Sequence, residues 1–567
     1  MLQRPGAEAR PAALHRPRGR ARVLLLLAPA LVCFGLSAYL SLRQPLFVGG
    51  DERAHLLYVA SVIDGRLPEF DNDFGAADRL PVVRRSLEGT AKGTDIDGVW
   101  VAYHPPLPYV LAAPPVWLAS ELGPDTWPAL TMRLVNAAAT ATGVVFVGLF
   151  AAELSPGRRR VGFAAACLTA VVANLVAVGS GGLNDGAGFA VAAASWFVAA
   201  RLLRCGPTAR ALTAACVAAS GAMLTRISLG PIAAMLAGAA CVSVWRHRPD
   251  RGVTWVAARR AVGAGLLVGG TALVTSGWFY WRNHQLYGRL TAPEAPPELA
   301  RVRPSPGPVE ELLTGTAFHR RIWSALYGTV SGPLAYVHAE RLVTALAVLL
   351  VLAAAVAALR RHRSGRAVAR TDGRDGAEAP VVLTDGIGAF GWVLVGGCCA
   401  AIIVGTADFV SAGGAPHPRY LFPVLPVASA LLARAIDELP LPRLVLTGVV
   451  GSLAAITVTQ LARVPELIET LPLVAPFDRS AVGPAWPRLA LGLALAAALA
   501  SAWIGWRGGD TRPAPPPAAT QPVAGGLYRS STSSTSAVDG VHATVPESRS
   551  SRTAATGSGS EKNRSSP

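Results

Sequence analysis

The sequence predicts an all-α polytopic membrane protein, and three observations lead to this fold class. Apolar residues make up 51% of the chain and charged residues only 15%, which is less charge than a soluble domain carries. The apolar residues fall in repeated runs of about 18 to 21 residues, a length that crosses the roughly 30 Å hydrocarbon core of a bilayer as a helix. Arginines gather at the ends of these runs, which is typical of topology signals.

The first predicted span runs from Val23 to Leu42. It follows six arginines, at positions 4, 10, 16, 18, 20 and 22, which place the N-terminus in the cytoplasm by the positive-inside rule. The run is too long for the apolar part of a signal peptide, and no small-residue cleavage pattern precedes Asp51, so we expect an uncleaved helix. The residues that follow this helix are therefore expected to face the outer side of the membrane.

Two apolar stretches, Leu107–Leu122 and Leu134–Leu149, precede the next basic cluster at residues 158–160. That cluster should be cytoplasmic, so only one of the two stretches can cross the membrane. Leu107–Leu122 is short and contains three prolines, which interrupt helical hydrogen bonding. We therefore expect this stretch to be a juxtamembrane segment at the outer interface and the other to be a span.

The later runs alternate in agreement with the arginine clusters and bring the predicted total to about twelve spans. These runs are 161–178, 183–203, 212–224, 227–245, 261–281, 342–359, 387–404, 420–436, 444–461 and 489–506. The expected organisation is a basic cytoplasmic N-terminus at 1–21, a transmembrane domain at 22–506 with outer loops at 43–133 and 282–340, and a cytoplasmic tail at 507–567. The tail is rich in Ser, Thr, Pro and Gly, which predicts disorder.

The formal charge of +17 does not indicate a nucleic-acid partner, because the arginines cluster at the ends of apolar runs and not along an exposed face. The seven cysteines all fall inside predicted spans or at their cytoplasmic ends. We therefore expect no disulfide framework and no cysteine metal site, and the cysteines fit small buried apolar side chains.

Polar side chains recur at the outer ends of the spans. The acidic pair Asp51 and Glu52 follows the first span, with His55 one turn later. Taken singly, such residues are usually solvated loop charges, helix caps, snorkelling arginines or contacts to lipid headgroups. Their gathering on one side of the membrane indicates a site. The other members of this set are His104, Asp185, Arg226, Arg282, Arg419 and Tyr420.

Carboxylates beside arginines at a membrane surface suit acid–base chemistry next to a phosphate. A carboxylate can take a proton from an acceptor hydroxyl, and arginines bind phosphate through paired, charge-assisted hydrogen bonds. A lipid-linked sugar would hold its phosphate at the depth of these loops and its tail between the helices. The expected partners are therefore a polyprenyl-phosphate-linked sugar and membrane lipid.

These residues carry a resemblance to a known superfamily. Asp51 and Glu52 after the first helix, followed by Gly65-Arg66-Leu67-Pro68, resemble the first outer loop of the GT-C superfamily of polyprenyl-phosphate-sugar glycosyltransferases. His104-Pro105-Pro106-Leu107 is similar to the motif that closes this loop in protein mannosyltransferases. Asn184-Asp185 occupies the position of the second acidic residue of that superfamily.

The resemblance continues later in the chain. An uncharacterised bacterial family of multi-spanning membrane proteins within the superfamily has patterns similar to Arg282-Asn283 with Leu286-Tyr287-Gly288, and to Arg419-Tyr420-Leu421 with Pro423 and Pro426. In all, the resemblance covers about residues 22–436 and implies a GT-C-like fold.

The resemblance also implies roles for individual residues. Asp51 is implied to be the general base on the acceptor, with Glu52 supporting it. Asp185 is implied to help hold the acceptor or, in some members, a divalent metal, for which Asp51 is the expected second ligand. His55, His104 and the three arginines with Tyr420 are expected to bind substrate. The outer loops are too short for the large soluble domain of some members, which leaves acceptor recognition open.

We therefore expect a membrane glycosyltransferase that moves a sugar from a polyprenyl phosphate carrier to a glycan, lipid or protein acceptor outside the cytoplasmic membrane. Inversion at the anomeric carbon is expected, because a single base-assisted displacement needs no covalent intermediate. The alternative is a transporter or flippase of lipid-linked glycan intermediates, against which stand the few charges within the spans and the lack of symmetric interrupted helices. A non-catalytic scaffold would have no reason to gather acids and arginines on one face.

Overall fold

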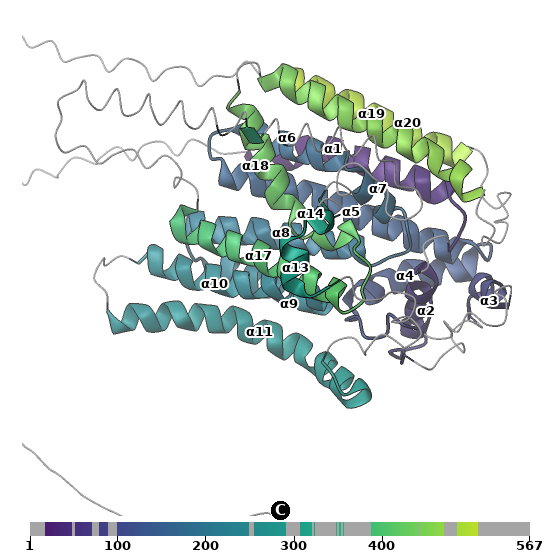
Figure 1. Ribbon diagram of the computed structural model, residues 1–567, viewed down its shortest axis with the longest axis horizontal. Helices are drawn as coiled ribbons and strands as arrows, with labels where there is room; N and C mark the ends of the chain where they lie inside the picture. Colours follow the sequence, from purple (N-terminus) through teal and green to yellow (C-terminus); the bar gives the residue numbers. More distant parts are fainter. Residues whose placement is uncertain are drawn as a thin grey trace, which may run out of the picture. The chain divides into compact units, whose positions relative to one another are not determined.

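The computed structural model is built of helices, and the residues that it describes contain no strand. It describes residues 18–47, 51–70, 79–88, 99–248, 254–290, 307–319, 387–439, 442–469 and 485–507, together with residues 322, 323, 348, 351, 352 and 355. Long helices run alongside one another, and the short helices α2, α3 and α4 gather near one end of them (Figure 1). The predicted all-α fold class is confirmed.

Eight of the described helices are long and apolar enough to cross a membrane, and each coincides with a predicted span. They are α1 (Arg18–Arg43), α5 (Trp127–Leu154), α8 (Asp185–Cys205), α10 (Gly230–Arg246), α11 (Trp255–Tyr287), α17 (Gly388–Ser411), α19 (Pro442–Glu469) and α20 (Ala485–Arg507). The 3-10 turn η2 (Ile227–Leu229) leads directly into α10. The chain is thus a multi-pass membrane protein.

Two predicted spans are shorter or bent in the structure. The span at 161–178 is formed by α6 (Arg159–Ala170) and α7 (Ala173–Gly179), which are bent by 65° relative to each other. The span at 212–224 is α9 (Ala209–Thr225), whose 17 residues fall short of the roughly 20 that a membrane helix needs.

The predicted span at 420–436 is broken near its start. The 3-10 turn η4 (Pro418–Leu421) is followed by the short helix α18 (Leu425–Asp437), because Pro423 and Pro426 cannot donate to the preceding turn. The predicted span at 342–359 lies outside the described residues except for four positions. Among the described residues there are eight membrane-length helices, or nine if the bent pair is one span, so the predicted total of twelve is not confirmed.

The segment between α1 and α5 carries α2 (Glu52–Ile63), α3 (Pro81–Glu88) and α4 (Leu107–Leu122). The rings of Tyr58 and Tyr109 stack between α2 and α4 with centroids 3.7 Å apart. Helix α4 has the bounds of the predicted juxtamembrane segment and, with 16 residues, is too short for a straight span. Its location at the outer interface stays a prediction.

The seventh predicted span extends further than the sequence indicated. Helix α11 continues to Tyr287 and ends at Gly288, whose φ of +70° is the left-handed conformation that commonly closes a helix. Arg282 therefore lies on a helix and not in the loop predicted at 282–340. Two short helices from that loop, α13 (Val309–Thr314) and α14 (Thr316–His319), place Leu312 and Phe318 in a small apolar cluster with Val410 of α17.

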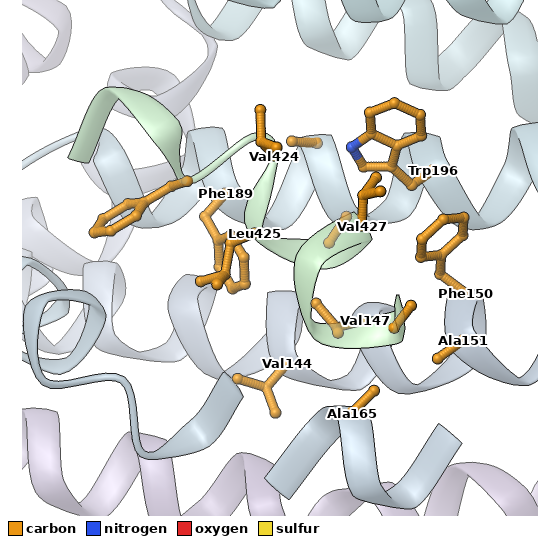
Figure 2. Close-up of a cluster of buried hydrophobic side chains, with 14 of the residues drawn as sticks. Val144, Val147, Phe150, Ala151, Ala165, Phe189, Trp196, Val424, Leu425 and Val427 are labelled. Carbon is orange, nitrogen blue, oxygen red and sulfur yellow. The ribbon is translucent and has the colours of Figure 1, made fainter. Parts of the chain in front are cut away.

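Part of the main apolar core lies between α5, α6, α8 and α18 (Figure 2). The rings of Phe150 and Trp196 lie 5.9 Å apart, and the indole nitrogen of Trp196 donates to the carbonyl of Pro423 at 2.7 Å. That carbonyl belongs to the break between η4 and α18, and a buried carbonyl freed from a helix needs such a donor. The contact ties the break to the middle of α8.

The two ends of the helices carry different charges. Asp185 begins α8, and Arg201 and Arg204 near its other end pair with Glu153 at 3.0 and 2.5 Å. Arg158 pairs at the same end of α5 with Glu438 at 2.6 Å. By the positive-inside rule, this arginine-rich end is predicted to be cytoplasmic and the Asp185 end to be outside.

Introduced cysteines are expected to report these two sides. In a variant without the seven native cysteines, a membrane-impermeant maleimide applied to intact cells should label Glu69→Cys and leave Arg210→Cys unlabelled, because both positions are exposed and lie at opposite ends of the helices. Permeabilised cells, in which both should react, are the control. Labelling of Arg210→Cys from outside would contradict the predicted topology.

Candidate functional site

Four charged side chains form one cluster. Arg419 donates to Asp51, with 2.7 Å between Nη2 and Oδ2, and its Nη1 lies 3.6 Å from Oδ2 of Asp185. Arg226 donates to the other oxygen of Asp185. The cluster alternates in sign and has a formal charge of zero. The side chain of Asp185 is 2% exposed and that of Asp51 is 36% exposed, so Asp51 is the acidic member that solvent reaches.

Helix ends place the members of this cluster. Asp51 is the N-cap residue of α2 and Asp185 is the first residue of α8, where the positive end of the helix dipole favours a carboxylate. Arg226 is the extended residue between α9 and η2, and Arg419 lies in η4. Although Asp51 and Arg419 are 368 residues apart in the chain, the packing of α8 against the broken segment brings them together.

The surroundings of Asp51 keep it ionised. Burial alone would raise the pKa of its carboxyl group, but the charge of Arg419 and the hydrogen bonds from Arg419 and Trp100 outweigh burial and hold the pKa below its ordinary value. The indole nitrogen of Trp100 donates to Oδ1 at 3.2 Å, and Arg419 donates to Oδ2. Asp51 is therefore a carboxylate with a donor on each oxygen.

His55 lies one turn after Asp51 in a hydrogen-bonded chain. The amide nitrogen of Asn184 donates to the Tyr109 oxygen at 3.2 Å, and that hydroxyl lies 2.8 Å from Nδ1 of His55. The Tyr109 hydroxyl keeps one hydrogen and a second lone pair, so it either donates to Nδ1 or accepts from Nδ1–H, according to the tautomer of His55. Burial lowers the pKa of His55 to about 4, so His55 is neutral at pH 7.

His104 lies next to His55, with ring centroids 6.1 Å apart. Three buried polar atoms in and beside the charged cluster have no hydrogen-bond partner among the described residues: Nδ1 of His104, Oδ1 of Asn184 and Nε of Arg419. Buried polar atoms are nearly always hydrogen-bonded. These three atoms therefore mark where hydroxyl or phosphate oxygens of a substrate, or ordered waters, can bind.

Glu52 binds Arg133 and two backbone nitrogens and does not join the charged cluster. Its carboxylate forms two parallel bonds with Arg133, Nε to Oε1 at 2.5 Å and Nη2 to Oε2 at 2.8 Å. It also accepts from the backbone nitrogens of Phe47 and Gly182 at 2.8 and 2.9 Å. With 3% of the residue exposed, no free oxygen faces a substrate. These contacts favour a structural role for Glu52 over the predicted catalytic one.

Arg133 was not singled out from the sequence, yet it organises this end of the protein. Its remaining N–H groups donate to the carbonyls of Ser41 and Gln44 at 2.9 Å and of Pro45 at 2.7 Å. All five guanidinium hydrogens are thus used, and the end of α1 is tied to α5. The available signal was an arginine within an apolar run, since intramembrane charge is rarely without a partner. Trp100 and Tyr109 carried no such signal.

Arg282 lies outside the charged cluster. Its Nη2 donates to the backbone carbonyl of Pro68 at 2.8 Å, within the Gly65–Pro68 motif of the first outer loop. Asn283 next to it donates to the carbonyl of Tyr103 at 3.1 Å. Arg282 therefore holds the outer loop against α11.

Tyr420 lies beside the cluster, with its ring 5.5 Å from the guanidinium carbon of Arg419, a cation–π distance.

The two aspartates do not fit a metal site in this arrangement. Arg419 bonds to Asp51 and lies close to Asp185, and Arg226 occupies the other oxygen of Asp185. Among the described side chains, no group of three or more His, Cys, Asp or Glu residues could hold a metal ion. A divalent metal on Asp51 and Asp185 stays a prediction that these contacts do not favour.

Fold and site together define a multi-pass helical membrane protein with a buried acid–arginine cluster at one end of its spans. No family model matches the sequence, and no curated protein matches it. The chain is similar to a crystal structure of ArnT from Cupriavidus metallidurans bound to undecaprenyl phosphate, with 15% identity and a TM-score of 0.40 over 86% of this chain and 77% of that one.

Proposed function

We propose that the protein transfers a sugar from a polyprenyl-phosphate-linked donor to an acceptor hydroxyl, on the outer side of the membrane. The observation that carries the proposal is the cluster of Asp51, Arg419, Asp185 and Arg226, assembled from four separate segments at one end of the membrane helices. It combines a solvent-accessible carboxylate with two arginines at the end of the spans where we expect a lipid-linked phosphate to lie.

The chemistry of the proposal divides between these groups. The acceptor oxygen attacks the anomeric carbon, the bond from that carbon to the phosphate oxygen breaks, and the acceptor proton passes to Asp51. The leaving polyprenyl phosphate gains negative charge, which Arg419 stabilises through charge-assisted hydrogen bonds. Asp185 is too enclosed to serve as base and orients Arg419 and Arg226. A single displacement of this kind inverts the anomeric centre.

A reconstituted assay tests the proposal against transport. Purified protein in liposomes should move labelled sugar from a synthetic polyprenyl-phosphoryl sugar to acceptor, and the carrier should be released as polyprenyl phosphate. A panel of donor sugars is needed, because nothing in the site identifies the sugar. Movement of intact labelled lipid between the leaflets, without any cleavage by the wild-type protein, would instead favour the transporter.

Arginine-to-lysine variants are expected to separate a phosphate ligand from a structural arginine. Arg419→Lys should weaken turnover and carrier-lipid binding about tenfold to a hundredfold, because lysine cannot bond two oxygens in one plane and a lost charge-assisted bond is worth about 1.5 to 3 kcal/mol. Arg226→Lys should have a smaller effect, through its bond to Asp185.

Arg282→Lys is the matched control within the same outer end. Its bond to the Pro68 carbonyl needs only a single donor, which lysine can supply, so carrier-lipid affinity should stay within a few-fold of the wild type. The measurement is lipid binding and turnover of the three variants side by side. Equal behaviour of Arg419→Lys and the wild type would remove Arg419 as the phosphate ligand.

A further inference from the structure

Arg419 is bonded to the base that we propose. Its Nη2 donates to Oδ2 of Asp51 at 2.7 Å, and its Nη1 faces Asp185 at 3.6 Å. A guanidinium group binds phosphate through the same N–H edges. Nε of Arg419 has no partner among the described residues, and a phosphate bound bidentately through the Nε and Nη2 edge shares Nη2 with Asp51. Full engagement of a phosphate on that edge therefore competes with the bond from Nη2 to Asp51.

We propose that the carrier phosphate takes Arg419 over from Asp51, so that Asp51 becomes an effective base only after the donor lipid has bound. This inference rests on the proposed function and adds an order of events to it. The donor comes first, and a water molecule or an acceptor that enters the empty site meets a carboxylate held by Arg419 and Trp100.

The charges of the cluster determine which aspartate changes its proton affinity when the phosphate binds. The four members sum to zero, and a phosphodiester donor adds one negative charge to a largely buried site, where an uncompensated charge is costly. Asp185 keeps its bond to Arg226 and its position at the start of α8. Asp51 keeps only the hydrogen bond from Trp100, and it is the more exposed of the two aspartates. The proton affinity of Asp51 therefore rises when the phosphate arrives.

Other titratable groups surround Asp51 and are competitors for a proton. Within α2, His55 has a pKa lowered to about 4 by burial, and burial also lowers the pKa of His104 in the loop before α4. Burial raises the pKa of Tyr103 in the same loop to about 12. Further charged or titratable neighbours among the described residues are Glu52 and Arg53, which follow Asp51 in the chain, Asp185 on α8, Arg226 before η2, and Arg419 and Tyr420 on η4. The two histidines are the competitors that a test must separate from Asp51.

The exchange of Arg419 predicts the direction in which donor binding and kcat change with pH. In the free protein the pKa of Asp51 lies below its ordinary value, and in the complex it lies higher, closer to neutral pH where a general base works best. Between these two values, donor binding takes up a proton, so the donor binds more tightly as the pH falls, by up to about tenfold per pH unit. In the same window kcat falls on acidification while kcat/KM stays level, since kcat reports the complex and kcat/KM the free enzyme.

Calorimetry of lipid binding tests the exchange without any turnover. The probe is undecaprenyl methyl phosphodiester in detergent micelles, whose single ionisation lies far below neutral pH and takes up no proton itself. Titrations between pH 5 and 8 in buffers of different ionisation enthalpy give the protons bound per lipid. The wild type should take up a fraction of a proton that grows toward one as the pH falls.

Two variants complete the experiment. Asp51→Asn should bind the diester with nearly pH-independent affinity and no proton uptake. Asp64→Asn, which removes a carboxylate of the same outer segment that pairs with Arg79 at 2.6 Å, should behave like the wild type. Binding of the diester by the wild type without proton uptake overturns the exchange, as does uptake that persists in Asp51→Asn, which would assign it to His55 or His104.

The outcome for the exchange is separable from that for the reaction. Proton uptake that depends on Asp51, together with failure of every donor sugar in the transfer assay, would leave the exchange standing and remove the proposed reaction. Transfer that proceeds without proton uptake would keep the reaction and remove the exchange. Failure of the diester to bind at all would remove the phosphate site on which both depend.

Discussion

Replacing Asp51 with asparagine is expected to lower sugar transfer by about 10²- to 10⁴-fold, the usual contribution of a general base. The amide has nearly the shape of the carboxylate but only one acceptor oxygen, so it can keep the hydrogen bond from Arg419 or the one from Trp100 and not both. The buried pair of Glu52 and Arg133 still holds the start of α2, so the fold should be kept. It cannot accept the acceptor's proton, so the loss should appear in kcat. The measurement is steady-state transfer in liposomes.

Asp64→Asn is the matched control for this variant. It removes one carboxylate from the C-cap of the same helix, α2, where Asp64 pairs on the surface with Arg79. Transfer by this control should stay within a few-fold of the wild type. Asp51→Asn with wild-type kcat would exclude Asp51 as the base, and the neighbouring neutral His55 would then be the next group to replace.

The second large effect is expected at Arg133. Arg133→Met leaves the carboxylate of Glu52 buried without a counter-charge and removes the donors to Ser41, Gln44 and Pro45. Breaking a buried ion pair from one side typically costs 3–5 kcal/mol. We expect a correspondingly large loss of stability of the detergent-purified protein in reversible denaturation, and a loss of transfer because the α1–α2 connection that carries Asp51 is released.

Two comparisons make this prediction specific. Arg79→Met breaks the exposed pair with Asp64 and should cost about 0 to 1 kcal/mol. Glu52→Gln combined with Arg133→Met removes both charges, and should be less destabilising than the sum of the single variants because no unpaired charge stays buried. Additive effects of the two substitutions would show that Glu52 and Arg133 do not act as a pair.

The sequence predicted the membrane helices well where the length of an apolar run was the deciding signal. Eight predicted spans coincide with long apolar helices, since hydrophobic length is a property of consecutive residues. This signal failed where prolines break a helix. Pro423 and Pro426 lie in an apolar run that reads as a span, but the structure divides it into η4 and α18, and the freed carbonyl of Pro423 is satisfied by Trp196 of a distant helix.

The arginines show the limit of the same reasoning at the site. Arg226, Arg282 and Arg419 are alike in the sequence, each at the predicted outer end of a span. Only two of them join Asp51 and Asp185, while Arg282 holds a loop carbonyl. Arg133, which was passed over, has the most complete set of partners. Which acid an arginine pairs with depends on helix packing, which a linear pattern does not contain.

The sequence by itself therefore determined the class of protein, most of its spans and the residue types of the site, because apolar length, arginine position and outer-end acids are read along the chain. The tertiary structure alone decided which partners the two acidic neighbours Asp51 and Glu52 have. These neighbours are chemically equivalent in the sequence, but one caps α2 beside Arg419 and the other is enclosed by Arg133. The physical reason is that a carboxylate takes its role from its partners, and these come from segments far away in the chain.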